Sequence, residues 1–258
     1  MIRVRAKKSL GQHFLKDLNI AEQIANSLNL TENTNVLEIG PGMGVLTQFL
    51  LQNSYINLTA VELDRESVNY LKLKFPKLNL IEADFLKLDL NIIFHNQKFC
   101  IIGNYPYNIS SQIIFKVLEY KNQIPICSGM IQKEVAERLT AKPKTKAYGI
   151  LSVLLQTYYD IEYLFTVHNY VFDPPPKVES AVIRLKRNKT EKIDCNEVLF
   201  KQIVKTAFNQ RRKQMRNSLQ SLISNKKLLN EEIFKKRAEE LSVNDFIYLT
   251  NLIEKNYV

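Results

Sequence analysis

The sequence predicts an α/β protein that contains a mostly parallel sheet and ends in a small all-helical domain. Short β-branched runs alternate with helical patterns over residues 17–186, an alternation typical of parallel sheets with helices on both faces. Two late strands flank the Asp173–Pro176 segment with no helix between them, which indicates an antiparallel pair at one sheet edge. A polar stretch at 186–192 precedes purely helical patterns. We therefore expect two domains, at residues 1–186 and 187–258.

Seven strands are expected where apolar and β-branched residues run between turn residues. In chain order, these are Asn35–Ile39, Leu58–Leu63, Leu78–Glu82, Phe99–Gly103, Ile126–Gln132, Glu162–Val167 and Ser180–Leu185. Helical periodicity in the first domain is found near residues 18–28, 45–53, 65–74, 110–120, 133–140 and 148–158. Four further helices are expected in the second domain, near residues 196–208, 212–223, 230–240 and 243–255.

The composition is that of an ordinary folded protein without a membrane span. Hydrophobic residues make up 45% and charged residues 24% of the 258 residues, enough to form a sizeable core. No apolar run is long enough to cross a bilayer, and the basic N-terminus has no apolar signal core. Cys100, Cys127 and Cys195 lie far apart, without the spacing of a zinc site or a disulfide framework. We therefore expect a cytoplasmic protein with no bound metal.

Positive charge is concentrated at the two ends of the chain, whose net charge is +10. Residues 1–16 carry five Lys or Arg and no acid, and residues 187–258 carry 15 basic against 9 acidic residues. A polyanion such as nucleic acid is one partner that fits this distribution, because basic side chains at phosphates release counterions. A solvated, Lys-rich surface is the other interpretation.

The sharpest local signal is a glycine-rich turn at the end of the first predicted strand. Gly40, Gly42 and Gly44 fall within five positions, although the whole chain has only seven glycines. Glycines there let the backbone turn tightly and approach a ligand. The spacing matches neither the dinucleotide fingerprint nor a P-loop. Glu62 and Asp84 follow at the ends of the next two strands, where carboxylates can bind ribose hydroxyls, an adenine amino group or a sulfonium cation. This arrangement resembles class I S-adenosylmethionine methyltransferases.

A second motif, Asn104-Tyr105-Pro106-Tyr107, ends the fourth predicted strand. It resembles the (Asp/Asn)-x-Pro-(Tyr/Phe) motif of methyltransferases that modify amino groups in nucleic acids. The adenine amino nitrogen is a poor nucleophile because its lone pair is delocalised into the ring. The Asn104 side-chain carbonyl and the Tyr105 backbone carbonyl would accept its two N–H groups and stabilise the positive charge that develops. Tyr107 would stack on the base, and Phe172, before the proline-rich loop, would form a second wall of the base pocket.

Five ordered blocks resemble the ribosomal RNA small-subunit adenine dimethyltransferase family over nearly the whole chain. They are Lys7–Leu15, Glu38–Thr47, Asn104–Tyr107, Phe172–Ser180, and Ala207–Lys213 with Arg216–Leu219. The resemblance implies a class I methyltransferase (Rossmann-like) fold. It also implies methyl transfer from S-adenosylmethionine to N6 of two adjacent adenines, in a hairpin near the 3′ end of small-subunit rRNA. The substrate would be an assembling 30S-type particle, and the enzyme a monomer that acts in ribosome biogenesis.

The resemblance further implies roles for individual residues. Cofactor contacts are expected from Gln12, His13, Leu15, Gly40, Gly42, Glu62, Asp84 and Asn104. Catalytic contacts to the adenine are expected from Asn104, Tyr105, Tyr107 and Phe172. RNA contacts are expected from Lys7, Lys8, Arg211, Arg212, Lys213 and Arg216. Tyr105 and His13 depart from the Leu or Ile and the Asn that are usual in the family. The backbone carbonyl and the hydrogen-bond donor expected at these two positions are nevertheless present.

Two other functions share parts of this pattern. Large-subunit rRNA adenine methyltransferases that confer macrolide resistance have the same core motifs, but the Asp173–Pro176 loop and the Phe208–Leu219 block favour the small-subunit group. A non-catalytic ribosome-assembly or transcription factor that retains the fold is the other alternative. The intact Asn104–Tyr107 motif argues against it.

Overall fold

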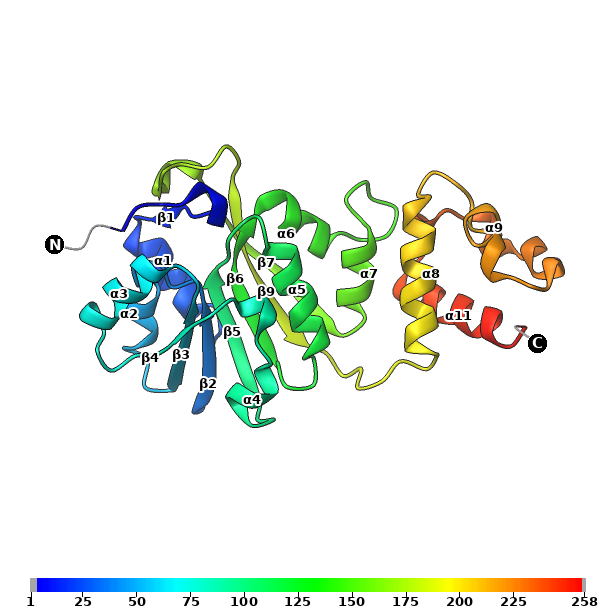
Figure 1. The fold of residues 1–258 in the computed structure, drawn as a ribbon. Coiled ribbons are helices and arrows are strands. Elements are labelled where there is room, and N and C mark those ends of the chain that lie inside the picture. The colour runs from blue at the N-terminus through cyan, green and yellow to red at the C-terminus, as the bar shows by residue number, and fades with distance from the viewer. Residues whose placement is uncertain (1–3, 257–258) are drawn as a thin grey trace. The chain divides into compact units, whose positions relative to one another are not determined.

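The computed structural model describes residues 4–256, which divide into two compact units (Figure 1). The first unit contains residues 4–136 and 161–187, and the second contains residues 137–160 and 188–256. The sequence alone predicts a single boundary after residue 186. Residues 137–160 group with the C-terminal helices because α7 (Ile150–Gln156) packs on α8 (Glu197–Asn209) and α11 (Val243–Glu254).

A seven-stranded sheet forms the centre of the first unit. Its spatial order is β4 (Asn79–Glu82), β3 (Ile56–Glu62), β2 (Thr34–Ile39), β5 (Phe99–Asn104), β6 (Ile126–Gln132), β9 (Ser180–Arg187) and β7 (Tyr159–Val167). The strands from β4 to β6 pair in parallel, whereas β9 pairs antiparallel with β6. The α/β class, the seven predicted strands and the antiparallel pairing towards one end of the sheet are therefore confirmed.

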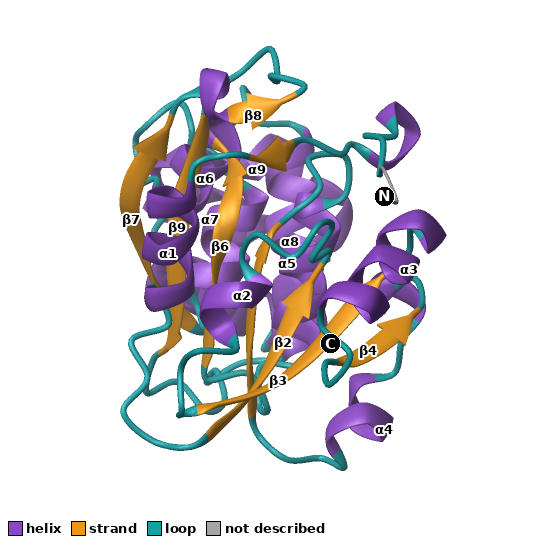
Figure 2. Cartoon of the chain, turned by 90° about the vertical axis from the view of Figure 1, so that its left-hand side faces the viewer, coloured by secondary structure: helices purple, strands orange, loops and turns teal. Residues whose placement is uncertain are grey.

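Helices cover both faces of this sheet, as Figure 2 shows, and they explain the composition of its strands. In that view α1 (Leu18–Asn26) and α2 (Thr47–Leu50) lie in front of the sheet and α5 (Ser110–Glu119) lies behind it. The last four residues of β2 are all buried, as expected for a central strand whose two faces are covered. Two further helices, α3 (Arg65–Lys74) and the short α4 (Leu90–Phe94), complete this unit with the start of α6 (Lys133–Thr140).

Two short strands have no counterpart in the sequence prediction. β1 (Phe14–Leu15) and β8 (Phe172–Asp173) form a separate antiparallel sheet, in which Phe14 lies opposite Asp173 and Leu15 opposite Phe172. A two-residue strand has no periodicity, and its partner lies in a remote part of the sequence. The pairing matters because it places the N-terminal segment beside the proline-rich loop.

The second unit is helical, and polar side chains cap the N-termini of its two long helices. The Asn196 side chain accepts the N–H groups of Val198 and Leu199 at the start of α8. Ser242 caps α11 in the same way, through the N–H of Asp245.

Two helices expected in the second unit are broken into shorter pieces. The 230–240 prediction corresponds to α10 (Glu232–Lys235) followed by a 3₁₀ turn, because the Lys236 carbonyl accepts the Met215 N–H at 2.8 Å and Arg237 pairs with Gln214. The 212–223 prediction likewise corresponds to α9 (Met215–Ser218) and a second 3₁₀ turn. Backbone pairing between the two segments replaces the helical hydrogen bonds.

Candidate active site

A cavity of about 200 Å³ lies at the carboxyl edge of the parallel strands in the first unit. The parallel register brings several strand ends to this edge, since Ile39 lies beside Val61 and Glu62 lies beside Glu82. The N-terminal segment Leu10–Leu15 supplies a further wall. All eight residues predicted to contact a cofactor line this cavity: Gln12, His13, Leu15, Gly40, Gly42, Glu62, Asp84 and Asn104.

The glycine-rich turn after β2 has a backbone conformation that glycine adopts without strain. Gly40 and Gly42 have φ angles of +66° and +57°. The Gly40 N–H donates to the Val61 carbonyl at 2.9 Å, which joins the turn to β3. A Cβ atom on Gly42 would lie 3.1 Å from the Phe14 ring, so the turn also packs closely against the N-terminal segment. The backbone of the turn is therefore held at the cavity, and neither Gly40 nor Gly42 places a side chain there.

Glu62, at the end of β3, fixes this turn from the neighbouring strand. Its buried carboxylate accepts the Gly42 N–H at 3.0 Å through one oxygen and the Asp64 N–H at 2.8 Å through the other. Burial raises the pKa of Glu62 above its ordinary value, although the backbone donors act in the opposite direction. Each carboxylate oxygen can accept another hydrogen bond. Glu62 can therefore bind ligand hydroxyls while it holds the glycine turn.

Glu38 is a cavity-lining carboxyl group to which sequence reasoning assigned no role. Its side chain is buried, and its Oε2 atom has no hydrogen-bond partner within residues 4–256. Burial raises the pKa of Glu38 to about 8, while the nearby Thr47 hydroxyl acts in the opposite direction. The sequence does carry a signal for Glu38, which is an acid within an apolar strand, two residues before the first glycine of the turn. Glu62 lies close by, and a positively charged ligand in the cavity would favour the ionised form of Glu38.

Asp84 adds a third acid from the end of β4. Its carboxylate accepts the Leu86 N–H at 3.0 Å and so caps a 3₁₀ turn. The side chain stays partly exposed, with the Lys87 ammonium 3.9 Å away. Asp84 lines the same cavity as Glu62, so acids from adjacent strands meet there.

Asn104, the last residue of β5, is held with its acceptor atom available. Its Nδ2 atom donates to the backbone carbonyl of His13 at 3.2 Å. Because the amide nitrogen makes this bond, the Oδ1 atom is left to accept hydrogen bonds from a ligand in the cavity that Asn104 lines. The next residue is fixed by β6, where the Met130 carbonyl accepts the Tyr105 N–H at 3.0 Å.

The Tyr105 ring points into the core and is only 1% exposed. Its hydroxyl donates to the Ser128 carbonyl at 2.7 Å. The ring occupies space that two glycines leave free, since a Cβ atom on Gly103 or Gly129 would lie within 3 Å of it. Only the backbone of Tyr105 is therefore available for chemistry at the cavity. The sequence motif assigns the contact with the adenine amino group to the backbone carbonyl of this residue.

The two aromatic residues predicted to hold a base lie in different surroundings. Tyr107 lines the cavity, its hydroxyl bonds to Ser180, and its ring lies 5.3 Å from the His13 ring. Phe172 is 1% exposed, belongs to the apolar core and does not line the cavity. Tyr107 thus lines the cavity, whereas Phe172 pairs with Leu15 and packs in the core.

The predicted RNA-contact residues also differ in their surroundings. The Lys7 ammonium is paired with two acids, whereas Lys8 is exposed. In the second unit Arg211 Nε donates to Glu239 at 2.7 Å, and its Nη2 donates to the Thr145 carbonyl at 3.2 Å. The side chains that remain exposed in this cluster are Arg212, Lys213 and Arg216.

The described residues offer neither a cluster of metal ligands nor a membrane-spanning helix. Residues 4–256 hold no group of three or more His, Cys, Asp or Glu side chains arranged to bind a metal ion. No helix in the same part of the chain combines the length and the apolar character that a membrane span requires. The groups available at the cavity are those of the residues that line it.

Two solved structures with the same fold are methyltransferases. A dimethyladenosine transferase from Plasmodium falciparum aligns with a TM-score of 0.81 at 23% identity, over 95% of this chain and 99% of that chain. The 23S rRNA methyltransferase ErmE aligns with a TM-score of 0.68 at 25% identity, over 92% of this chain and 99% of that chain. The fold and the cavity together define a class I methyltransferase.

The chain belongs to the ribosomal RNA adenine dimethylase family, whose model matches residues 3–255. A ribosomal RNA small subunit methyltransferase A from Parabacteroides distasonis is 60% identical, over 98% of this chain and 96% of that protein. The protein of the same name from Porphyromonas gingivalis is 56% identical, over 99% of this chain and all of that protein. The family expected from the sequence motifs is confirmed.

Proposed function

We propose that the protein transfers methyl groups from S-adenosylmethionine to the N6 amino nitrogen of adenines in small-subunit rRNA. The family is named for adenine dimethylation, and the relatives are named for the small ribosomal subunit. The observation that carries the proposal is the hydrogen bond from Asn104 Nδ2 to the His13 carbonyl, because it leaves the amide oxygen as an acceptor at the cavity. By family resemblance, the targets are two adjacent adenines in a hairpin near the 3′ end.

The cavity suits S-adenosylmethionine in its chemistry. Glu62 and Asp84 offer acceptors for ribose hydroxyls and for an adenine amino group. A ligand with positively charged sulfonium and ammonium groups would lower the pKa of Glu38 and stabilise its ionised form. The turn at Gly40 and Gly42 lets the backbone approach such a ligand. When bound, S-adenosylmethionine supplies an electrophilic methyl group on positively charged sulfur.

Asn104 and Tyr105 prepare the target nitrogen for attack. Asn104 Oδ1 and the Tyr105 carbonyl accept the two N–H groups of adenine, which draws the lone pair away from the ring. The same two acceptors stabilise the positive charge on nitrogen as the N–C bond forms and the C–S bond breaks. A strong base is not needed before attack, because the proton leaves after the nitrogen has become cationic. Tyr107, with its hydroxyl held by Ser180, stacks on the base.

RNA contacts come from the basic C-terminal unit in this proposal. The exposed side chains of Arg212, Lys213 and Arg216 bind phosphates, which position an RNA without reading its bases. The target adenine has to leave its stack to reach the cavity. The substrate is an assembling 30S-type particle, on which the enzyme acts as a monomer in the cytoplasm.

Transfer of labelled methyl groups separates this function from its rivals. The purified protein is incubated with tritiated S-adenosylmethionine and with small subunits that lack the modification, or with large-subunit RNA in a parallel reaction. We expect label in small-subunit rRNA, recovered as N6,N6-dimethyladenosine after digestion. Label confined to large-subunit RNA would place the enzyme in the other rRNA group. Cofactor binding without transfer to either RNA would indicate a non-catalytic factor.

A further inference from the structure

An N-terminal segment with little secondary structure of its own forms one wall of the cavity. We call residues 7–15 the N-terminal strap, of which Leu10–Leu15 line the cavity. The strap touches the catalytic loop, because a Cβ atom on Gly11 would lie 2.7 Å from Asn108 Oδ1 and the His13 carbonyl accepts the Asn104 amide. The shape of this wall therefore depends on how the strap is attached at its two ends.

At its carboxyl end the strap is attached mainly through backbone groups. β1 pairs with β8, and His13 Nδ1 donates to the Pro174 carbonyl at 2.7 Å. Just beyond the strap, the Lys16 N–H donates to the Val171 carbonyl at 2.8 Å. This attachment is spread over several hydrogen bonds and does not depend on a single side chain.

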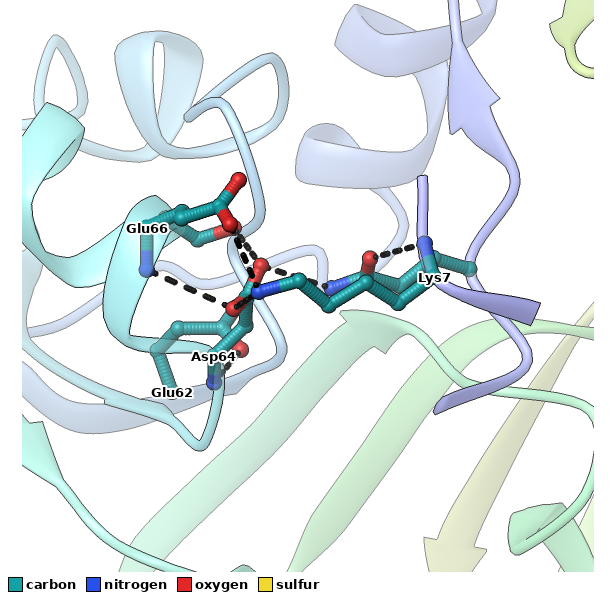
Figure 3. A network of polar contacts seen from close by, with 6 residues as sticks. Lys7, Glu62, Asp64 and Glu66 are labelled. Atoms are coloured by element: carbon teal, nitrogen blue, oxygen red, sulfur yellow. Dashed lines mark hydrogen bonds and ion pairs between the residues drawn. The ribbon is translucent and has the colours of Figure 1, made fainter. Parts of the chain in front are cut away.

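At its amino end the strap is attached through the Lys7 side chain (Figure 3). The Lys7 ammonium bonds to Asp64 Oδ1 and lies 3.2 Å from Glu66 Oε1. The Lys7 backbone N–H donates to Gln12 Oε1 at 2.8 Å, and Gln12 Nε2 reaches Asp64 Oδ2 at 3.4 Å. Two strap residues thus converge on one carboxylate, which belongs to the turn between β3 and α3.

Asp64 needs this cation because its side chain is only 1% exposed. Burial alone would raise the pKa of Asp64, but hydrogen bonds from Lys7, Gln12 and Ser67 outweigh burial and hold the pKa below its ordinary value. A buried carboxylate that loses its cationic partner is costly. Removal of the ammonium would therefore disturb Asp64 as well as release the strap.

Asp64 in turn connects the strap to the cofactor residues. Its backbone N–H donates to Glu62 Oε1 at 2.8 Å, and the other oxygen of Glu62 holds the Gly42 N–H. A chain of direct contacts therefore runs from the Lys7 ammonium to the glycine turn. Lys7 itself does not line the cavity.

We propose that Lys7 is a positioning residue, which fastens the N-terminal strap over the cavity and so sets the affinity for the cofactor. A loose strap would have to be ordered when the cofactor binds, and that ordering lowers affinity. The methyl-transfer step stays intact once the cofactor is bound, because His13 and Asn104 are held by the other attachment. Two acids already neutralise the ammonium, so it has little attraction left for RNA phosphate. This inference rests on the proposed S-adenosylmethionine site.

The test compares Lys7→Met and Lys7→Arg with Lys16→Met, a matched loss of charge at an exposed position of the same N-terminal region. Calorimetry gives the Kd for S-adenosylhomocysteine, and methyl-transfer kinetics at saturating RNA give kcat and the KM for S-adenosylmethionine. We expect Lys7→Met to raise Kd and KM about tenfold and to leave kcat within about twofold, since the strap and Asp64 act on cofactor binding rather than on the transfer step. Lys7→Arg should recover most of the affinity, and Lys16→Met should match the wild type.

Unchanged affinity for S-adenosylhomocysteine in Lys7→Met would overturn the proposal, as would a loss confined to RNA affinity, which would make Lys7 a phosphate contact. Failure of the wild-type protein to bind S-adenosylhomocysteine would refute the proposed function and this inference together. If circular dichroism shows that Lys7→Met is unfolded, Glu66→Gln takes its place, since it removes only the half-exposed acid. A weakening of about threefold is then expected, in keeping with a partly exposed ion pair. An unchanged Kd in Glu66→Gln would count equally against the proposal.

Discussion

The carboxylate of Glu62 accepts the N–H of Gly42 at 3.0 Å, so the acid that ends β3 holds the glycine turn that ends β2. The same carboxylate accepts the Asp64 N–H and lines the cavity. One side chain therefore joins the two strand ends between which we place the cofactor. Disturbing either partner of this bond should alter cofactor binding.

Gly42→Ala tests this relationship directly. Alanine at a φ of +57° is strained by about 1–2 kcal/mol, and its Cβ atom would press on the Phe14 ring. We expect a comparable loss in the free energy of unfolding and a Kd for S-adenosylhomocysteine at least about tenfold higher, because the turn and the strap both shift. Gly149→Ala is the control, since Gly149 is extended and an added Cβ atom meets nothing closer than 4.0 Å. Wild-type affinity in Gly42→Ala would show that the turn does not contact the cofactor.

Asn104→Ala removes the side-chain acceptor for the adenine amino group. We expect kcat to fall by about 100-fold or more, the usual effect of deleting one preorganised group that stabilises developing charge. S-Adenosylhomocysteine should still bind measurably by calorimetry, because the other cavity residues are unchanged. Asn26→Ala, at an exposed position in α1, controls for the loss of an asparagine amide. Undiminished turnover in Asn104→Ala would refute the assigned role.

The raised pKa of Glu38 predicts how the free energy of unfolding depends on pH in the absence of cofactor. Its pKa is about 8 in the folded protein, against an ordinary value of 4.5 for a glutamate, so between these pH values the folded state holds a proton that the unfolded state has lost. The free energy of unfolding should therefore fall as pH rises through this window, by up to about 1.4 kcal/mol per pH unit from this group. Above pH 8 the contribution should level off.

Urea denaturation of the wild type and of Glu38→Gln at several pH values isolates this contribution. The glutamine variant cannot lose a proton, so its unfolding free energy should decline less steeply between pH 5 and pH 8, on the scale of about 1 kcal/mol per unit. Parallel curves for the two proteins would contradict the buried, protonated state that we infer for Glu38.

The phosphate contacts proposed for Arg212 and Arg216 predict how RNA binding depends on salt concentration. Each contacts one phosphate in our proposal, so Arg212→Ala or Arg216→Ala should lower the slope of log K against log salt concentration by about 0.7–1. Filter binding to small-subunit rRNA across a series of salt concentrations gives the slope. Lys226→Ala, an exposed change in the same unit, should leave it unaltered. A slope that stays constant in both arginine variants would rule out these contacts.

Arg211 should behave differently from its neighbours in the same cluster. Glu239 and the Thr145 carbonyl already engage its guanidinium, which joins three segments of the second unit. We expect Arg211→Ala to lower the free energy of unfolding by about 1 kcal/mol, because a partly buried, charge-assisted pair is lost. Thermal unfolding of Arg211→Ala beside Arg212→Ala measures this difference, and equal melting temperatures would contradict it.

The amino-acid sequence by itself determined the main sheet, the two long C-terminal helices and most of the cavity. Buried strands and amphipathic helices leave periodic patterns that can be recognised locally. Parallel strands also end at one edge of a sheet. The strand pattern therefore predicts that four residues lie close together at that edge: Gly40, Glu62, Asp84 and Asn104. The ordered motifs led from there to the family, which the comparisons confirm.

Only the tertiary structure decided how the parts of the site are held. It paired β1 with β8, placed the Lys7 ammonium against Asp64 and buried Phe172 in the core. It also left the Oε2 atom of Glu38 without a hydrogen-bond partner among residues 4–256. Each of these outcomes depends on contacts between segments far apart in the chain and on the exclusion of water from them. Such contacts have no local periodicity, and the state of a charged group follows from its neighbours in space, which a linear pattern does not specify.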